Sequence, residues 1–216
     1  MKREDVTVEL EEVSLPGYLR RPPAMRGVVI FAHGTGSSRD SSRNNYVADR
    51  LADAKIGSLL FDLLTEAEDS SYETRFEIDL LQRRMTGALR WAGKGDLARG
   101  TPYGLFGSST GSAAALATAA EVARGEVADA PEVSAIVSRG GRPDMAEEAI
   151  PGVSAPTLLI VGGRDIQVLQ LHHQIFEKFQ AEAVLEIVED ASHLFQEPGA
   201  LERVADLAVD WFSSRL

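Results

Sequence analysis

The feature that most constrains the fold of this chain is a regular alternation of short apolar runs with helix-patterned segments. Runs such as Val28–Ala32 and Ile56–Phe61 are apolar at almost every position, as expected of strands that are buried on both faces. Segments such as Tyr72–Trp91 and Leu201–Phe212 place their apolar residues at helical spacing instead. Repeated strand–helix units of this kind predict a mostly parallel sheet with helices on both faces.

Reading the whole chain in this way predicts eight strands and five helices. The expected strands are Val6–Val13, Tyr18–Arg21, Val28–Ala32, Ile56–Phe61, Tyr103–Phe106, Val133–Val137, Thr157–Val161 and Val184–Val188. The expected helices are Asn45–Ala54, Tyr72–Trp91, Thr110–Arg124, Gln167–Gln180 and Leu201–Phe212. A turn is expected at Pro16-Gly17. We find no internal repeat or low-complexity linker, and the connection Gly125–Glu132 leaves little room for a lid. The prediction is one α/β domain, residues 1–216, with a twisted eight-stranded sheet and no cap domain.

Composition excludes several classes of function. The net charge of −11 argues against a basic surface for nucleic acid or for an anionic membrane. There are no cysteines, which excludes disulfides, thiolate nucleophiles and cysteine-ligated metals. No stretch approaches the ~18 apolar residues of a membrane span, and no apolar signal-peptide core follows the charged start at Met1–Asp5. We therefore expect a cytoplasmic protein that binds neither nucleic acid nor membrane.

Ligands of open parallel sheets bind beyond the carboxyl ends of the strands, and one of these ends carries a sharp motif. Gly107-Ser108-Ser109-Thr110-Gly111 fits G-x-S-x-G, follows an apolar strand and opens a helix, which is the context this motif requires. The turn raises the hydroxyl of Ser109 into the cleft, and its strained backbone needs small neighbours. The alternative is an ordinary Gly/Ser turn before an Ala-rich helix. The context favours Ser109 as a nucleophile.

A serine nucleophile needs a base, and the base needs a carboxylate. His193 follows the last strand, on a loop before the final helix. Asp165 follows the preceding strand, after Gly162-Gly163. Triads of Ser, Asp and His occur on several folds. One of these folds has the chain order Ser, Asp, His that is seen here, whereas the other common ones have different orders. Alternatives remain open: His193 could be a surface histidine, Asp165 could be a helix N-cap, and Asp144 is a rival acid.

The other histidines fit the role of base less well. His172 and His173 lie in a helical pattern, and we expect them to face solvent or to be weakly packed. His33 lies in a loop that we expect it to brace.

An oxyanion intermediate also needs two hydrogen-bond donors. One is expected to be the backbone N–H of Thr110, directly after the nucleophile. The other is expected from the glycine-rich loop His33–Ser38, where the N–H of Thr35 is the best placed. That loop lacks the Gly-Lys-Ser/Thr ending of a phosphate loop.

Together these motifs resemble the α/β-hydrolase superfamily, and within it the small, lidless proteins similar to dienelactone hydrolase. The resemblance spans nearly the whole chain. It rests on Phe31–Arg39, Phe61–Thr65, the motif around Ser109, and Ser138–Asp144. It implies a Ser109–Asp165–His193 triad with oxyanion donors at Thr35 and Thr110. One departure is clear: founding dienelactone hydrolases use a cysteine nucleophile, whereas this chain has a serine.

The resulting functional expectation is a carboxylesterase-like serine hydrolase. It would cleave a small soluble ester or lactone through an acyl-enzyme intermediate, without metal or organic cofactor, as a monomer or small homo-oligomer. Two alternatives remain. The same triad could transfer the acyl group to an alcohol or peroxide, as an acyltransferase or perhydrolase, or the chain could be a non-catalytic binding protein on a hydrolase scaffold.

Four arginines fall in loops near the expected cleft, and arginine suits the binding of carboxylate or phosphate. Arg39 and Arg139 are the candidates for binding substrate, with Arg43 and Arg142 beside them. Ordinary salt bridges with this acidic chain are the alternative. Asp62, at the end of a strand, is expected to be a structural carboxylate.

Overall fold

In the computed structural model, which describes residues 3–94 and 100–216, the eight predicted strands form one sheet. Its order is β1-β2-β4-β3-β5-β6-β7-β8. The strands are β1 (Glu4–Glu9), β2 (Ser14–Arg20), β3 (Gly27–Ala32), β4 (Ile56–Phe61), β5 (Tyr103–Ser108), β6 (Val133–Arg139), β7 (Thr157–Gly162) and β8 (Ala183–Val188). Neighbouring strands along the series β4-β3-β5-β6-β7-β8 pair in parallel, whereas β2 runs antiparallel to both β1 and β4. The predicted eight-stranded, mostly parallel sheet is confirmed.

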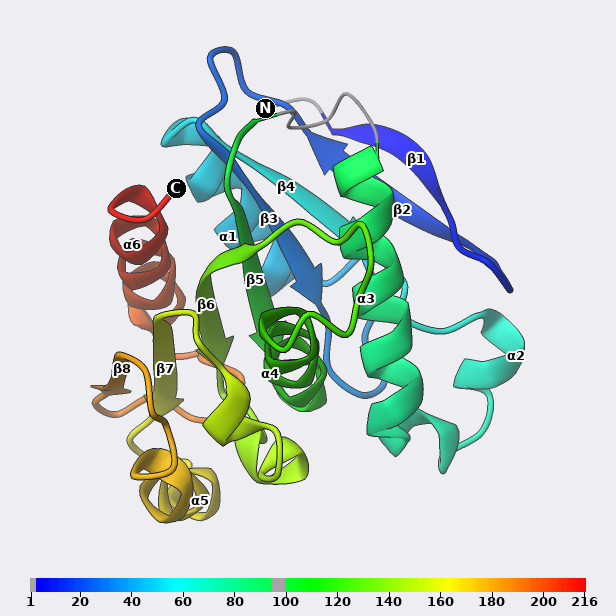
Figure 1. Ribbon diagram of the computed structural model, residues 1–216. Coiled ribbons are helices and arrows are strands. Elements are labelled where there is room, and N and C mark those ends of the chain that lie inside the picture. Colours follow the sequence, from blue (N-terminus) through cyan, green and yellow to red (C-terminus); the bar gives the residue numbers. More distant parts are fainter. Residues whose placement is uncertain (1–2, 95–99) are drawn as a thin grey trace.

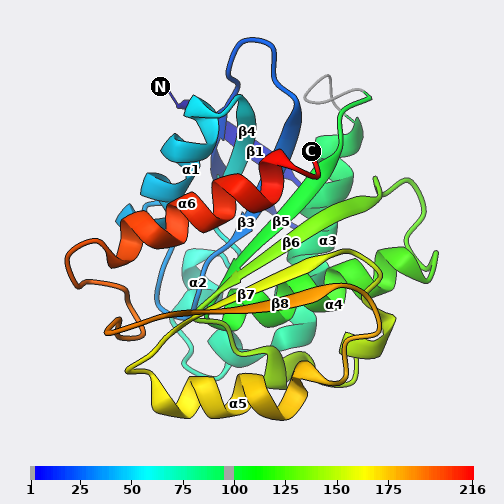
Figure 2. The same cartoon turned by 90° about the vertical axis from the view of Figure 1, so that its left-hand side faces the viewer.

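Helices cover both faces of this sheet (Figures 1 and 2). One face carries α1 (Ser42–Asp53) and α6 (Ala200–Ser213), and the other carries α3 (Ile78–Lys94), α4 (Thr110–Ala123) and α5 (Ile166–Phe176). The remaining helices are short: α2 (Glu66–Asp69) and the 3₁₀ helices η1 (Thr74–Phe76), η2 (Pro143–Ala146) and η3 (Ile150–Gly152). These short elements agree with the expectation that no cap domain is inserted. No helix in the described part of the chain is both long and apolar enough to cross a membrane.

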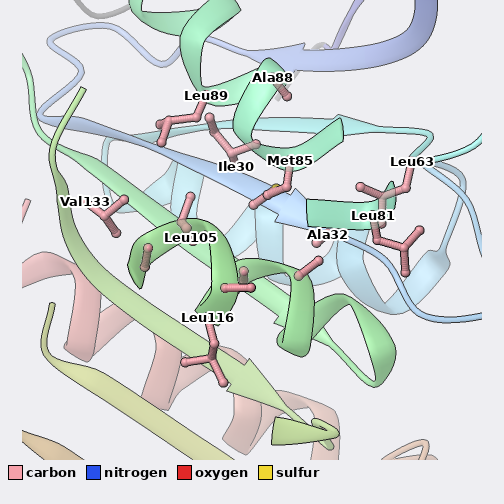
Figure 3. Close-up of a cluster of buried hydrophobic side chains, with 14 of the residues drawn as sticks. Ile30, Ala32, Leu63, Leu81, Met85, Ala88, Leu89, Leu105, Leu116 and Val133 are labelled. Atoms are coloured by element: carbon pink, nitrogen blue, oxygen red, sulfur yellow. The ribbon is translucent and has the colours of Figure 1, made fainter. Parts of the chain in front are cut away.

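The core lies in two layers, one on each side of the sheet. Between the sheet and helices α3 and α4, Met85 and Leu89 of α3 pack toward Ile30 of β3 and Leu105 of β5, all fully buried (Figure 3). On the other face, α6 packs its buried Phe212 against the sheet. Each fully buried side chain of this size stabilises the fold by about 1.5–3 kcal/mol. The central strands are therefore held rigidly, and so are the loops at their carboxyl ends, at the lower end of the sheet in Figure 1.

Two local predictions were wrong. The first hairpin turns at Leu10–Val13, where the Leu10 N–H donates to the Val13 carbonyl at 2.9 Å, and not at Pro16-Gly17. Both Pro16 and Gly17 belong to β2 and pair with β1. Proline fits there because it contributes only its carbonyl, which accepts a hydrogen bond from the Asp62 N–H.

The long helix predicted at Tyr72–Trp91 begins only at Ile78. The sequence before it forms α2, because Thr65 and Glu68 make a reciprocal capping box, and then η1. The chain turns out of helical geometry at Glu77, with ψ of 84°. The segment from α2 to η1 therefore leaves the helix layer and extends to the loop that contains Thr35, whose hydroxyl lies 3.4 Å from the Arg75 carbonyl.

Candidate active site

The turn between β5 and α4 holds Ser109 in a strained conformation. Its backbone has φ of 51° and ψ of −124°, a region that non-glycine residues rarely adopt and that is concentrated at functional sites. Small neighbours make this possible, because a Cβ on Gly107 would overlap backbone atoms of α4, and one on Gly111 would overlap the carbonyl oxygens of Ala32 and His33 at the end of β3. The Ser109 hydroxyl does not cap α4, and it makes no hydrogen bond within residues 3–94 and 100–216. It is thus available for chemistry.

Asp165 and His193 form a pair at the same edge of the sheet. His193 Nδ1 lies 2.6 Å from Asp165 Oδ2, and the carboxylate side chain is only 13% exposed whereas the imidazole is 38% exposed. Asp165 precedes α5 but its side chain does not cap that helix. The rival acid, Asp144, instead makes a bidentate ion pair with Arg142, with N···O distances of 2.7 and 2.8 Å. The geometry thus gives His193 the carboxylate partner that a general base requires.

The loop after β6 contacts both Ser109 and His193. The Ser109 N–H donates to the Arg139 carbonyl at 3.2 Å, and the Arg142 N–H donates to the Ser109 carbonyl at 3.1 Å. Between these residues, Gly140 has φ of +51°, and a Cβ there would lie 3.5 Å from His193 Nδ1. The loop therefore brings the serine turn and the histidine loop into one neighbourhood, although they are far apart in sequence.

The two residues that are expected to donate to the oxyanion, Thr35 and Thr110, contact each other through a hydrogen bond that the sequence did not predict. Gly34 is pressed against the serine turn, because a Cβ there would lie 2.8 Å from Ser109 Cβ. The N–H of the next residue, Thr35, donates to the hydroxyl of Thr110 at 2.9 Å, and the two threonine hydroxyls lie 3.0 Å apart. The Thr35 N–H thus points toward the serine turn, and the Thr110 hydroxyl is its partner in this structure.

His33 braces the glycine-rich loop His33–Ser38, as predicted, and does so as a neutral ring. Its Nδ1 lies 3.0 Å from the Gly34 carbonyl, and its Nε2 accepts the Leu63 N–H at 3.0 Å. Burial lowers the pKa of His33, because a charged imidazole loses its hydration there. A neutral His33 is required, since a protonated Nε2 could not accept a hydrogen bond.

The candidate substrate-binding arginines differ sharply in their surroundings. Arg39 is held by Asp62, through its backbone N–H at 2.7 Å and through a guanidinium ion pair, so Asp62 has the structural role that we expected. This pairing occupies Arg39. Arg139 has no carboxylate partner among residues 3–94 and 100–216. Its burial, together with the nearby charge of Arg43, lowers its pKa to about 10. Within the described part of the chain, its guanidinium makes one hydrogen bond, to the side-chain oxygen of Asn44 at 3.3 Å. Asn44 was not predicted, and no motif in the sequence marks it.

The expectation for His172 was wrong, since this side chain is fully buried. Its Nδ1 bonds the Val168 carbonyl at 2.8 Å, while its buried Nε2 has no hydrogen-bond partner among the described residues. The helix α5 packs against η2, and this tertiary contact buries the face that bears His172. Its neighbour His173 is exposed, as expected.

Burial of His172 and His33 predicts a loss of stability in mild acid. Burial lowers the pKa of both imidazoles in the folded state. The unfolded chain therefore takes up protons first, and the free energy of unfolding falls as the pH drops below ~6.5, by up to about 1.4 kcal/mol per pH unit and per histidine. Urea unfolding between pH 7.5 and 5 measures this. His172→Gln should flatten the dependence, with His173→Gln as the control. An identical slope in wild type and His172→Gln would contradict the prediction.

Other hollows and clusters do not compete with this site. A cavity of about 420 Å³ lies between the first hairpin, α3 and the end of α4, with Trp91 in its wall. Its Arg84 and Arg90 are paired with glutamates. Within the described ranges, no group of three or more His, Asp or Glu side chains is arranged to hold a metal ion.

Comparisons with known structures agree closely with this architecture. A dienelactone hydrolase from Anabaena variabilis is 46% identical, with a TM-score of 0.93 over 100% of this chain and 98% of that one. Est1E from Butyrivibrio proteoclasticus shares the fold at 13% identity and a TM-score of 0.81, over 97% and 98% of the two chains. The esterase domain of a Rhodothermus marinus protein shares it at 17% identity and a TM-score of 0.78, over 100% and 99%. The chain matches no protein-family model.

Curated relatives from two strains of Mycobacterium tuberculosis are 45% identical over 216 residues and carry the provisional name phosphoribosyl transferase. The match covers 100% of this chain but 47% of each relative. This chain thus spans about half the length of the curated proteins that it matches.

Proposed function

This chain belongs to the dienelactone hydrolase family of α/β hydrolases, and we propose that within this family it is a serine hydrolase that cleaves a small carboxylic ester or lactone. The observation that carries the proposal is the pairing of His193 with Asp165 at the edge of the sheet where Ser109 is held in a strained turn. A cysteine nucleophile is not available, because the chain has no cysteine. Small acyl groups are favoured, since the elements beside the site are short.

The proposed reaction proceeds in two steps. His193 takes the proton of the Ser109 hydroxyl as the serine oxygen attacks the ester carbonyl carbon, and then passes that proton to the departing alcohol. Water, deprotonated by the same imidazole, attacks the acyl-enzyme and releases the acid. Asp165 holds the Nδ1–H of the imidazole and stabilises its charged form, which supports the assignment of Nε2 to proton transfer.

The oxyanion of each tetrahedral intermediate would bind the backbone N–H groups of Thr35 and Thr110. For the Thr35 N–H to reach it, the Thr110 hydroxyl, which accepts this N–H at 2.9 Å, must give way. A rotation about the Cα–Cβ bond of Thr110 would move its hydroxyl and release the Thr35 N–H. The loss of one such donor costs enzymes of this kind about 3–4 kcal/mol of transition-state stabilisation.

Covalent labelling tests the proposed nucleophile directly. A fluorophosphonate probe should react with wild-type protein once per chain, and mass spectrometry of the digest should place the adduct on Ser109. Turnover of p-nitrophenyl esters from acetate to octanoate should fall with acyl length. No adduct and no turnover of any ester would favour a non-catalytic binding protein instead.

Acyl transfer to another acceptor remains the second candidate, since it uses the same residues. It differs only in the nucleophile of the second step, so product analysis with competing alcohol or peroxide separates the two. The name of the Mycobacterium tuberculosis relatives refers to proteins about twice as long. Phosphoribosyl transfer is not part of the proposal for this chain, because the proposed roles of Ser109, His193 and Asp165 are those of acyl chemistry.

A further inference from the structure

Arg139 is a buried cation without an anion. It ends β6, and its Cα pairs with that of Ser108 on the neighbouring strand, one residue before the nucleophile. The residue is 7% exposed. Its Nη2 donates to Asn44 at 3.3 Å, while Nε and Nη1 are fully buried and have no hydrogen-bond partner. Its neighbour Ser108 also approaches Asn44, at 3.5 Å.

A second arginine faces the same place. Arg43 lies in the first turn of α1, beside Asn44. Its positive charge is close enough to lower the pKa of Arg139. Its Nε is buried without a partner, and it forms no ion pair with any carboxylate of residues 3–94 and 100–216. The Arg43 side chain as a whole is only partly buried, so solvent reaches the pair from this side.

It is unusual in this chain for arginines such as Arg43 and Arg139 to lack a carboxylate partner among the described residues. Asp and Glu number 33 against 22 Lys and Arg, and arginines elsewhere pair with them, including Arg39 with Asp62 and Arg142 with Asp144 at the same edge of the sheet. A buried guanidinium without a counterion loses hydration energy that nothing in the protein restores. Two adjacent ones also repel each other. An anion bound between them would remove both costs.

We propose that Arg43 and Arg139 form a binding site for a phosphate group of the substrate, beside Ser109. Two guanidinium groups and the positive end of α1 favour a dianion over a singly charged carboxylate. Assigning the phosphate to the substrate rests on the proposed hydrolase function. The substrate is then a phosphorylated small ester or lactone, oriented by its phosphate so that its carbonyl meets Ser109.

Calorimetric titration with inorganic phosphate at constant ionic strength tests the site without any turnover. Wild type and Ser109→Ala should bind phosphate equally. Arg43→Gln and Arg139→Gln should each raise the dissociation constant tenfold or more, about the effect of losing one charge-assisted contact. Arg50→Gln, on the exposed side of the same helix, is the matched control for charge and should bind like wild type. If Arg139→Gln does not fold, the dissociation constant of Arg43→Gln for phosphate tests the proposal.

Equal phosphate affinity in wild type, Arg43→Gln and Arg50→Gln would overturn the proposal. Acetate binding as tightly as phosphate would overturn the preference for a dianion. Turnover then tests the link to the substrate. Arg43→Gln should lower kcat/KM for a phosphorylated ester at least tenfold more than for a neutral p-nitrophenyl ester, whereas Arg50→Gln should leave both within twofold. An equal loss on both esters would count against it. Phosphate binding without esterase activity would instead mean that the hydrolase assignment fails while the anion site stands.

Discussion

Ser109→Ala should lower kcat for p-nitrophenyl acetate by a factor of ~10⁴ or more. The alanine keeps the turn and the pair Asp165–His193 but removes the oxygen that would form the proposed acyl-enzyme. In serine hydrolases with a triad, the loss of the nucleophile has an effect of this order, and the residual rate comes from the oxyanion donors and from binding. Release of p-nitrophenolate by wild type and mutant, with circular dichroism to verify the fold, measures it.

A matched control separates this effect from general damage. Ser134→Ala removes the same hydroxyl group from the start of β6, at the opposite end of that strand from the loop that contacts Ser109. It should retain wild-type activity within about twofold, as expected for a substitution away from the site. If Ser109→Ala hydrolyses the ester as fast as Ser134→Ala does, Ser109 is not the nucleophile.

Asp165→Asn should have the second largest effect, a fall in kcat of about 10³–10⁴. The amide is almost the same size as the carboxylate, so the fold should survive. It can donate to His193 Nδ1 and so favours the tautomer that carries its proton on Nε2, which cannot accept the serine proton. It also leaves the imidazolium of the intermediate without its counterion. Initial rates with the same ester from pH 6 to 9 measure the loss.

Asp144→Asn is the paired control for this experiment. Asp144 was the rival acid in the sequence, and in the structure its two oxygens bind Arg142. Its loss should reduce kcat by less than about tenfold, through the loop that contacts Ser109. If Asp144→Asn were the inactive variant and Asp165→Asn the active one, the assignment of the acid would have to be reversed.

The elements of the sheet were predictable because burial on both faces leaves a direct trace in sequence. Ile56–Phe61 is apolar throughout and coincides with β4. Predictions failed where local signals competed. Pro16-Gly17 is a common turn pair, yet pairing with β1 and the approach of Leu60 and Phe61 hold it in a strand. The helical pattern predicted from Tyr72 was interrupted by the 3₁₀ helix η1 and by Glu77, whose ψ of 84° is not helical, and periodicity alone does not reveal this break.

The sequence by itself determined the fold class and the candidate residues Ser109, Asp165 and His193, because strand order places the carboxyl ends of parallel strands at one edge. Only the tertiary structure decided which charges find partners. It paired Asp165 rather than Asp144 with His193, and it placed Asp62 against Arg39. In the part of the chain that the structure describes, it also left Arg43 and Arg139 without a carboxylate. Ion pairs and burial depend on distances between segments remote in the chain, and residue identity and spacing do not encode these distances locally.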